Sequence, residues 1–267
     1  MKKYLFIFLL FTLFISCEKE LEFKYQDVES QLVIEGTLSE DGTKVTLTYT
    51  VPMDEPIITE PIIDAEITLT DITYDISYIL TSENGIFIND VPGVPTHNYE
   101  LSVTHKGKNF KSSCVMRKGV EIVDLKLQWI KMPYDHVAVL EIVSTVSEIS
   151  GTCYWTKIYK NGEPYKWLMS HGSGAIDGKL TQTTFTTRQN PEDENDKDNL
   201  KEGDVLSVTV IPISLDMYDY LVGISSDSNG PAMFTGDFCL GYFLAAERAE
   251  ASIVFHPEDI PFYPNLD

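Results

Sequence analysis

Apolar and polar residues alternate along most of the chain in short runs. The segments 31–36, 44–51 and 65–71 show this alternation clearly, and they are rich in Val, Ile, Thr and Tyr. A two-residue period is typical of a strand with one buried face, and β-branched and aromatic side chains favour that structure. The runs recur about every 8 to 12 residues, which is the spacing of β-sandwiches. The pattern therefore predicts a mainly β protein.

The first part of the pattern predicts an immunoglobulin-like or transthyretin-like β-sandwich over residues 31–118. Asp41-Gly42 lies between two strand-like runs and predicts an opening hairpin, because these residues accept the backbone conformations of a tight turn. Asn84-Gly85 and Lys106-Gly107 indicate two further turns in the same way. We also predict that the strand pattern continues over 72–80.

Residues 119–267 are predicted to form a second antiparallel β domain with one short helix. Asn161-Gly162 lies between apolar runs and is the strongest hairpin signal in the chain. Near 214–224 the apolar period becomes helical, with Leu215 behind Ser214, a favourable N-cap residue. The strands expected in this domain are 120–130, 136–143, 152–160, 203–211, 238–247 and 249–255.

Residues 1–16 have the parts of a lipoprotein signal peptide. Lys2 and Lys3 precede an apolar core of about 12 residues that ends just before Cys17. A membrane-spanning helix needs roughly 20 apolar residues, so we expect this segment to be removed after export. Residues 13–17 resemble a lipobox, with less common residues at two positions. Cys17 is therefore the predicted lipidation site, and the alternative is a secreted protein whose signal includes Cys17.

Residues 17–30 are predicted to be an acidic tether. Glu18, Glu20 and Glu22 follow Cys17 closely. An acidic patch at this place resembles the signal that sends Bacteroidota lipoproteins to the outer face of the outer membrane. The alternative is a charged, solvated tether without a sorting role. No later apolar run approaches spanning length, so we expect the lipid to be the membrane anchor and the protein to be exposed on the cell surface.

The charge balance argues against nucleic acid as a partner. The chain has 20 Lys and Arg residues against 41 Asp and Glu residues, and loss of Lys2 and Lys3 with the signal leaves a net charge of -23. Such a negative field repels polyphosphates. The hydrophobic content of 43% is well above that of disordered chains, so a sizeable core is expected.

The remaining cysteines and the histidines form no recognisable metal motif. Cys114, Cys153 and Cys239 permit at most one disulfide, and no two have Cys-x-x-Cys spacing. The five histidines include no His-x-x-x-His pair. The acidic segment 192–199 offers oxygen ligands but lacks the glycine and glutamate of an EF-hand calcium loop. We predict no metal site and no cofactor, and small buried side chains for most of the cysteines.

A hydrolase triad is the one catalytic arrangement that the residue types suggest. His171-Gly172-Ser173-Gly174 with Asp177 nearby contains a base, a nucleophile and a carboxylate. Ser173 lacks the Gly-x-Ser-x-Gly context of a nucleophile elbow, and proximity in sequence is not triad geometry. We interpret the segment as a glycine loop and predict no catalytic residue.

Aromatic residues crowd one stretch of the second β domain, where they either form core or bind a ligand. On alternating strands about half of them must face inward. Exposed flat rings can instead stack on sugars or contact a partner. Trp167, which follows Lys166 beyond the predicted turn, is the ring that we expect to be exposed. The residues concerned are Trp129, Tyr134, Tyr154, Trp155, Tyr159, Tyr165 and Trp167.

Several short motifs together resemble a Bacteroidota lipoprotein family known as domain of unknown function 4249. They are Gly36 after its strand, 64–71, 99–108, Gly203-Asp204-Val205, 213–220 and Gly241-Tyr242-Phe243. The segment Asp237-Phe238-Cys239 departs from the family pattern. The resemblance implies a gene neighbour that encodes a TonB-dependent transporter, and it supplies no catalytic residue.

These observations lead to one functional expectation and one alternative. We expect a noncatalytic outer-membrane lipoprotein, anchored through Cys17, that acts as an accessory or ligand-capture partner of a TonB-dependent transporter and binds a nutrient or the transporter itself. The alternative is a surface carbohydrate-binding module. The sequence does not indicate the ligand-binding residues or the oligomeric state.

Overall fold

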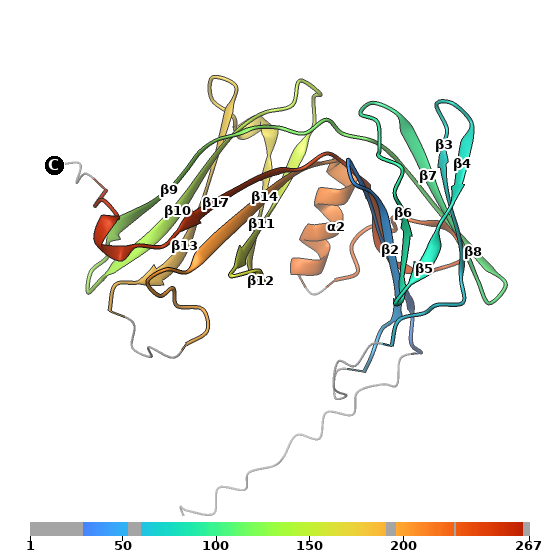
Figure 1. The fold of residues 1–267 in the computed structure, drawn as a ribbon, viewed down its shortest axis with the longest axis horizontal. Coiled ribbons are helices and arrows are strands. Elements are labelled where there is room, and N and C mark those ends of the chain that lie inside the picture. Colours follow the sequence, from blue (N-terminus) through green and yellow to red (C-terminus); the bar gives the residue numbers. More distant parts are fainter. Residues whose placement is uncertain (1–28, 53–59, 191–195, 227, 264–267) are drawn as a thin grey trace, which may run out of the picture.

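The computed structural model describes residues 29–52, 60–190, 196–226 and 228–263. The predicted signal peptide, Cys17 and nearly all of the acidic tether lie outside these residues, as does most of the acidic segment 192–199. No helix of the described part is both long and apolar enough to cross a membrane. The chain folds into two β-sandwiches with helix α2 (Leu215–Ser225) between them (Figure 1).

The first sandwich consists of two five-stranded sheets. Sheet 1 has the strand order β16-β1-β2-β6-β5, and sheet 2 has the order β15-β8-β7-β3-β4. The bounds of sheet 1 are β1 (Leu32–Ser39), β2 (Gly42–Tyr49), β5 (Thr81–Glu83), β6 (Ile86–Asn89) and β16 (Leu240–Ala245). Those of sheet 2 are β3 (Glu66–Asp71), β4 (Ile76–Ile79), β7 (Asn98–His105), β8 (Lys108–Val115) and β15 (Thr235–Gly236).

The second sandwich pairs a three-stranded sheet with a four-stranded one. Sheet 3 has the order β13-β10-β9, and sheet 4 has the order β12-β11-β14-β17. The bounds are β9 (Ile122–Lys131), β10 (His136–Thr145), β11 (Cys153–Lys160), β12 (Glu163–His171), β13 (Lys179–Arg188), β14 (Val205–Ile213) and β17 (Ala249–Val254). Two short 3-10 turns, Gly172–Gly174 and Pro257–Asp259, complete the described elements.

The predicted fold class is confirmed: the protein is mainly β, with a sandwich first and a largely antiparallel β region with one helix afterwards. The two-residue turn of Asn161 and Gly162 has φ values of 52° and 88°, which is why this dipeptide joins β11 to β12. Ser214 caps α2, because its hydroxyl oxygen accepts a hydrogen bond from the Met217 N–H. The helix predicted near 214–224 is therefore also confirmed.

The predicted strand over 72–80 is wrong in its first half. Residues 72–75 form a turn, and only Ile76–Ile79 is strand, paired back onto β3. The Asp71 carboxylate causes the turn, since it accepts a hydrogen bond from the Thr73 N–H and also contacts His97 Nδ1 at 2.7 Å. Local side-chain hydrogen bonding therefore overrides the alternation of apolar residues.

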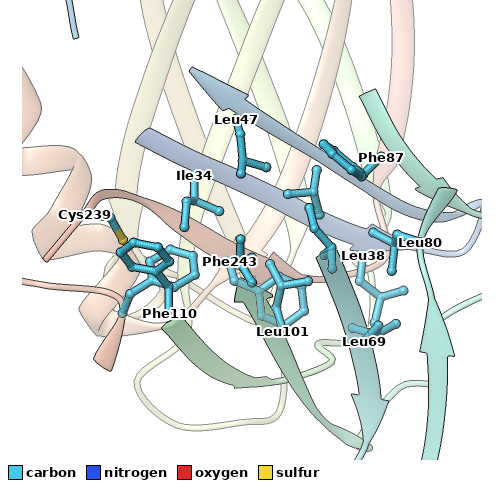
Figure 2. Packing of buried hydrophobic residues seen from close by; sticks show 14 of the residues in the cluster. Ile34, Leu38, Leu47, Leu69, Leu80, Phe87, Leu101, Phe110, Cys239 and Phe243 are labelled. Carbon is cyan, nitrogen blue, oxygen red and sulfur yellow. The ribbon is translucent and has the colours of Figure 1, made fainter. Parts of the chain in front are cut away.

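The predicted division into domains 31–118 and 119–267 is wrong for two strands near the end of the chain, because they belong to the first sandwich. Strand β16, which we expected in the second domain, lies parallel to β1 in sheet 1, with Val33 opposite Leu240 and Leu38 opposite Ala245. Strand β15 likewise joins sheet 2 at β8. Figure 2 shows the consequence: Phe243 lies among the core residues of the first sandwich, and Cys239 packs at its edge.

Both faces of β16 are buried. Phe243 and Ala245 belong to the core of the first sandwich, whereas Tyr242 and Leu244 belong to a separate apolar cluster with α2 and sheet 4. A strand covered on both faces reads as a continuous apolar run instead of an alternating one. The second cluster includes Met217 and other residues of α2, so the helix fills the space between sheet 1 and sheet 4.

The two chain segments that connect the sandwiches run side by side. The Arg117 N–H donates to the Ala245 carbonyl at 3.0 Å, and the Glu247 N–H donates to the Arg117 carbonyl at 2.9 Å. The Glu247 carboxylate accepts a further hydrogen bond from the Gly119 N–H at 2.8 Å. The junction is thus a short hydrogen-bonded ladder with fixed geometry.

We expect Gly241→Ala to destabilise the protein more than Gly162→Ala. Both glycines have left-handed φ values, 106° and 88°, so each substitution strains the backbone by about 1–2 kcal/mol. Only at Gly241 would the new Cβ also meet the Ile34 carbonyl oxygen, at 1.9 Å. Urea-induced unfolding of both variants measures the difference. Equal losses in the free energy of unfolding would contradict the close contact between β1 and β16.

Candidate functional site

A groove of about 410 Å³ lies where the two sandwiches and α2 meet. We call it the interdomain groove. Three separate parts of the chain line it: sheet 1, helix α2, and strands β11 and β12 of sheet 4. Its lining side chains include Glu35, Trp155, Lys157, Trp167, Leu221 and Tyr242.

The alternation of β11 decides which of its side chains reach the groove. Tyr154 and Ile158 point into the core of the second sandwich, so Trp155, Lys157 and Tyr159 lie on the opposite, outer face of sheet 4. On the neighbouring strand, Trp167 lies directly opposite Lys157. The hairpin therefore places two tryptophans and a lysine together on one face.

A chain of ring contacts crosses from the second sandwich to the first. The rings of Trp167 and Trp155 meet edge to face at 6.4 Å and 77°, and Trp155 meets Tyr242 of β16 at 6.0 Å and 84°. Tyr242 continues to Tyr220 of α2 at 5.9 Å. Edge-to-face geometry is the favoured arrangement of aromatic pairs. Trp167, Trp155, Tyr242 and Tyr220 thus form one aromatic array, and the first three of these rings line the groove.

Lys157 is held over this array without an ion pair among the described residues. Its ammonium nitrogen lies 3.8 Å from the centre of the Trp155 ring, which is a cation–π contact. Burial lowers the pKa of Lys157, the nearby carboxylate of Glu35 opposes that shift, and Arg248 adds to it. The indole N–H of Trp155 is buried and has no hydrogen-bond partner in the described structure.

The hydroxyl of Tyr165 differs from the Trp155 indole N–H because it has hydrogen-bond partners within the protein. It donates to the backbone carbonyls of Asp198 at 2.8 Å and Thr186 at 3.1 Å, and burial raises its pKa. Trp167 is 41% exposed. As the sequence predicted, this ring has an open surface, and it is the most exposed of the large rings that line the groove.

The predicted aromatic group divides between the core, the groove and one exposed turn. Trp129 and Tyr154 are buried in the second sandwich, and Tyr134 is 99% exposed on the turn between β9 and β10. The other four members of the group, Trp155, Tyr159, Tyr165 and Trp167, line the groove.

Sequence reasoning missed the contribution of the first sandwich to this site. Glu35 and Tyr242 come from strands that are adjacent only because β16 pairs with β1. Their register places Glu35 directly opposite Tyr242. No local pattern signals this, because Glu35 occupies an ordinary outward position of an alternating strand.

The structure gives no triad geometry to His171, Ser173 and Asp177. Ser173 lies in a 3-10 turn, and Asp177 lies in the following turn with a φ of 50°. His171 instead approaches the Cys153 sulfur at 3.3 Å. Cys153 is 1% exposed, so its thiol is not accessible to a substrate, and burial raises its pKa, which disfavours the reactive thiolate.

The three cysteines of the described residues are all free, so no disulfide joins any pair of them. Burial raises the pKa of both Cys114 and Cys239 to about 12, as for thiols packed in apolar surroundings. Within the described ranges, no three His, Cys, Asp or Glu side chains gather in a way that could hold a metal ion.

The fold and the groove define a protein of two β-sandwiches with an aromatic groove between them. The profile of the family described as Domain of unknown function (DUF4249) matches residues 18–250, and the chain therefore belongs to this family, as the sequence motifs predicted. No curated protein matches the sequence.

Among solved structures, a DUF4785 family protein from Legionella pneumophila is similar over 68% of this chain, with 10% identity and a TM-score of 0.26. The chain covers 52% of that structure, which is about half of its length.

We expect Glu35→Gln to lower the pKa of Lys157 further and Arg248→Gln to raise it. The negative charge of Glu35 stabilises the ammonium form, whereas the positive charge of Arg248 destabilises it. NMR titration of ¹³C-methylated lysines measures both shifts, and Lys157→Arg identifies the signal. Shifts of the same sign in the two variants would contradict the charge arrangement of the groove.

Proposed function

We propose that this protein is a noncatalytic, lipid-anchored binding protein of the outer membrane that captures a ligand for a TonB-dependent transporter. The observation that carries the proposal is the interdomain groove, where a half-exposed tryptophan lies beside a lysine and a carboxylate. Concave sites with aromatic walls and few polar groups are typical of ligand binding.

A binding role fits the groove better than a catalytic one. In the described part of the chain, the thiol nearest a histidine is that of Cys153, and it is buried. The Tyr165 hydroxyl already donates hydrogen bonds to backbone carbonyls. A nucleophile needs an adjacent base and access to substrate. Lys157 and Glu35 offer charges that can orient a ligand, and among the described residues neither side chain is hydrogen-bonded to a hydroxyl or a thiol.

The lipid anchor would make weak binding between this protein and a transporter sufficient. The 14 residues from Cys17 to Ser30 span at most roughly 50 Å when fully extended. A protein held this close to the membrane has a high local concentration at a transporter in the same membrane. A ligand captured in the groove is then released near the transporter instead of into the medium.

A surface carbohydrate-binding module is the second candidate function. The open face of Trp167 is the observation that favours it, because a flat ring suits the apolar face of a sugar. Such a module acts without a transporter, so the two functions differ in their partner and share the groove.

Cys17→Ala should abolish membrane attachment, because the thiol that accepts the lipid is lost. Partition of the expressed protein into the detergent phase of Triton X-114 and incorporation of labelled fatty acid measure the change. Cys114→Ala, which removes a free cysteine of the folded part, is the matched control and should still be lipidated. Detergent-phase partition and fatty-acid labelling of Cys17→Ala at the level of the control would refute lipidation at this residue.

A TonB-dependent transporter should co-purify with the tagged protein from detergent-solubilised outer membrane. The Cys17→Ala variant should recover much less of it, since the high local concentration in the membrane is lost. Mass spectrometry of the eluted proteins measures the recovery. Repeated purification of the lipidated protein without any transporter would refute the partnership and leave the carbohydrate-binding module as the better function.

A further inference from the structure

A second hollow adjoins the interdomain groove on the outer face of sheet 4. Its volume is about 540 Å³, and it shares Lys157 and Tyr159 with the groove. We call it the sheet-4 trough. Its other side chains of interest are Ser207, Thr209, Arg248, Glu250 and Ser252. Because the two hollows meet along β11, one ligand can occupy both.

The strand register arranges the outward side chains in rows across the sheet. Lys157 lies opposite Trp167 on one side and opposite Thr209 on the other, and Thr209 lies opposite Glu250. Directly opposed residues share a face of a sheet. This row crosses four strands, which is about 14 Å at the usual spacing between strands. Trp167 stands at its apolar end and Glu250 at its polar end.

A second row supplies hydroxyl groups next to the first. Tyr159 lies opposite Ser207, and Ser207 lies opposite Ser252. Val208 points into the core of the second sandwich, so Ser207 and Thr209 on either side of it point outward. In the described structure, the side chains of Ser207, Thr209 and Ser252 form no hydrogen bond to protein groups. They are free to bond a ligand.

The combined site carries charges of both signs. Glu35 and Glu250 supply carboxylates, and Lys157, Lys166 and Arg248 supply cations. Arg248 pairs with Asp41 and lies 3.6 Å from Glu40, and the Lys166 ammonium donates to the Phe185 carbonyl. An anionic ligand would meet two carboxylates, and a cationic ligand would meet three cations. A neutral ligand that carries hydroxyl groups suits side chains of both charges, because a hydroxyl donates to a carboxylate and accepts from an ammonium group.

We propose that the interdomain groove and the sheet-4 trough form one elongated site for a neutral oligosaccharide, with one sugar ring on Trp167 and the following units along the row of Lys157, Thr209 and Glu250. The inference rests on the proposed ligand capture in the groove, and it adds the ligand class and the direction of binding. A sugar ring buries its C–H face against the indole, while its rim hydroxyls reach the carboxylates and hydroxyls of the rows.

An extended peptide fits this site less well. Peptides that add to sheets use the unpaired backbone of an edge strand. The combined site lies on a sheet face instead, and β11 and β14 at its centre are paired on both sides. Side chains alone are presented there.

The experiment measures binding of lipid-free protein, lacking residues 1–17, to neutral oligosaccharides of two to six units. The probes are gluco-, xylo- and manno-oligosaccharides, with oligogalacturonates as anionic controls and a library of unstructured peptides as the competing class. Isothermal titration calorimetry and tryptophan fluorescence report binding. We expect at least one neutral oligosaccharide to bind, with an affinity that increases from two units to four.

Three variants locate the site. Trp167→Ala should weaken binding at least about tenfold, because the stacking surface is lost. Thr209→Val, which keeps the side-chain shape and removes one hydroxyl, should weaken binding of four-unit probes by up to about tenfold and leave two-unit probes nearly unchanged. Tyr134→Ala removes an exposed ring outside the site and should bind like the wild type. Urea unfolding verifies that all three variants are folded.

Several results would overturn the inference. They are absence of binding to any neutral oligosaccharide at millimolar concentration, stronger binding of oligogalacturonates or peptides, and equal affinity of Trp167→Ala and Tyr134→Ala. If these occur while a transporter still co-purifies, only the ligand class and the site are refuted. If oligosaccharides bind as expected and no transporter co-purifies, the transporter partnership is refuted and the inference stands.

Discussion

The parallel contact between β1 and β16 is the constraint on which the rest of the structure depends. It brings the end of the chain into the first sandwich, where Phe243 and Ala245 complete the core. The opposite face of β16 then has to be covered, and Tyr242 and Leu244 pack with α2 and sheet 4. One strand therefore links the two sandwiches through its two faces, and Gly241 permits the close approach of the strands because a Cβ there would meet the Ile34 carbonyl oxygen.

The same contact fixes the geometry of the interdomain groove. β16 continues directly into β17 through Ala246 and Arg248, beside the segment around Arg117 to which it is hydrogen-bonded. The walls contributed by sheet 1 and sheet 4 are thus held at a set distance before any ligand arrives. A preformed site avoids much of the ordering cost of binding. Helix α2 also helps to preform the groove, because it is packed between the two sheets and lines the groove.

The chemistry of the groove contrasts with that of the protein as a whole. The chain has a net charge of -21, yet the ammonium of Lys157 lies over the Trp155 ring in the groove. The carboxylate of Glu35 acts on this ammonium electrostatically. The aromatic array from Trp167 to Tyr220 supplies the apolar surface, and the outward rows of sheet 4 supply hydroxyls. Packing explains the buried members of this array. Two features remain for which packing alone gives no reason: the half-exposed ring of Trp167, and the ammonium of Lys157, which has no ion pair within the described part of the chain.

The sequence by itself determined what depends on neighbouring residues. Asn161-Gly162 specified a hairpin and Ser214 specified the start of α2, because turns and caps depend on backbone conformations and hydrogen bonds within a few residues. The exposure of Trp167 also followed from its local setting. Only the tertiary structure decided that β16 joins β1, and therefore that Glu35 and Tyr242 share a groove with Trp167. An apolar strand that is buried on both faces carries no mark of its partner, because parallel pairing over a long sequence distance is chosen by the packing of the whole chain.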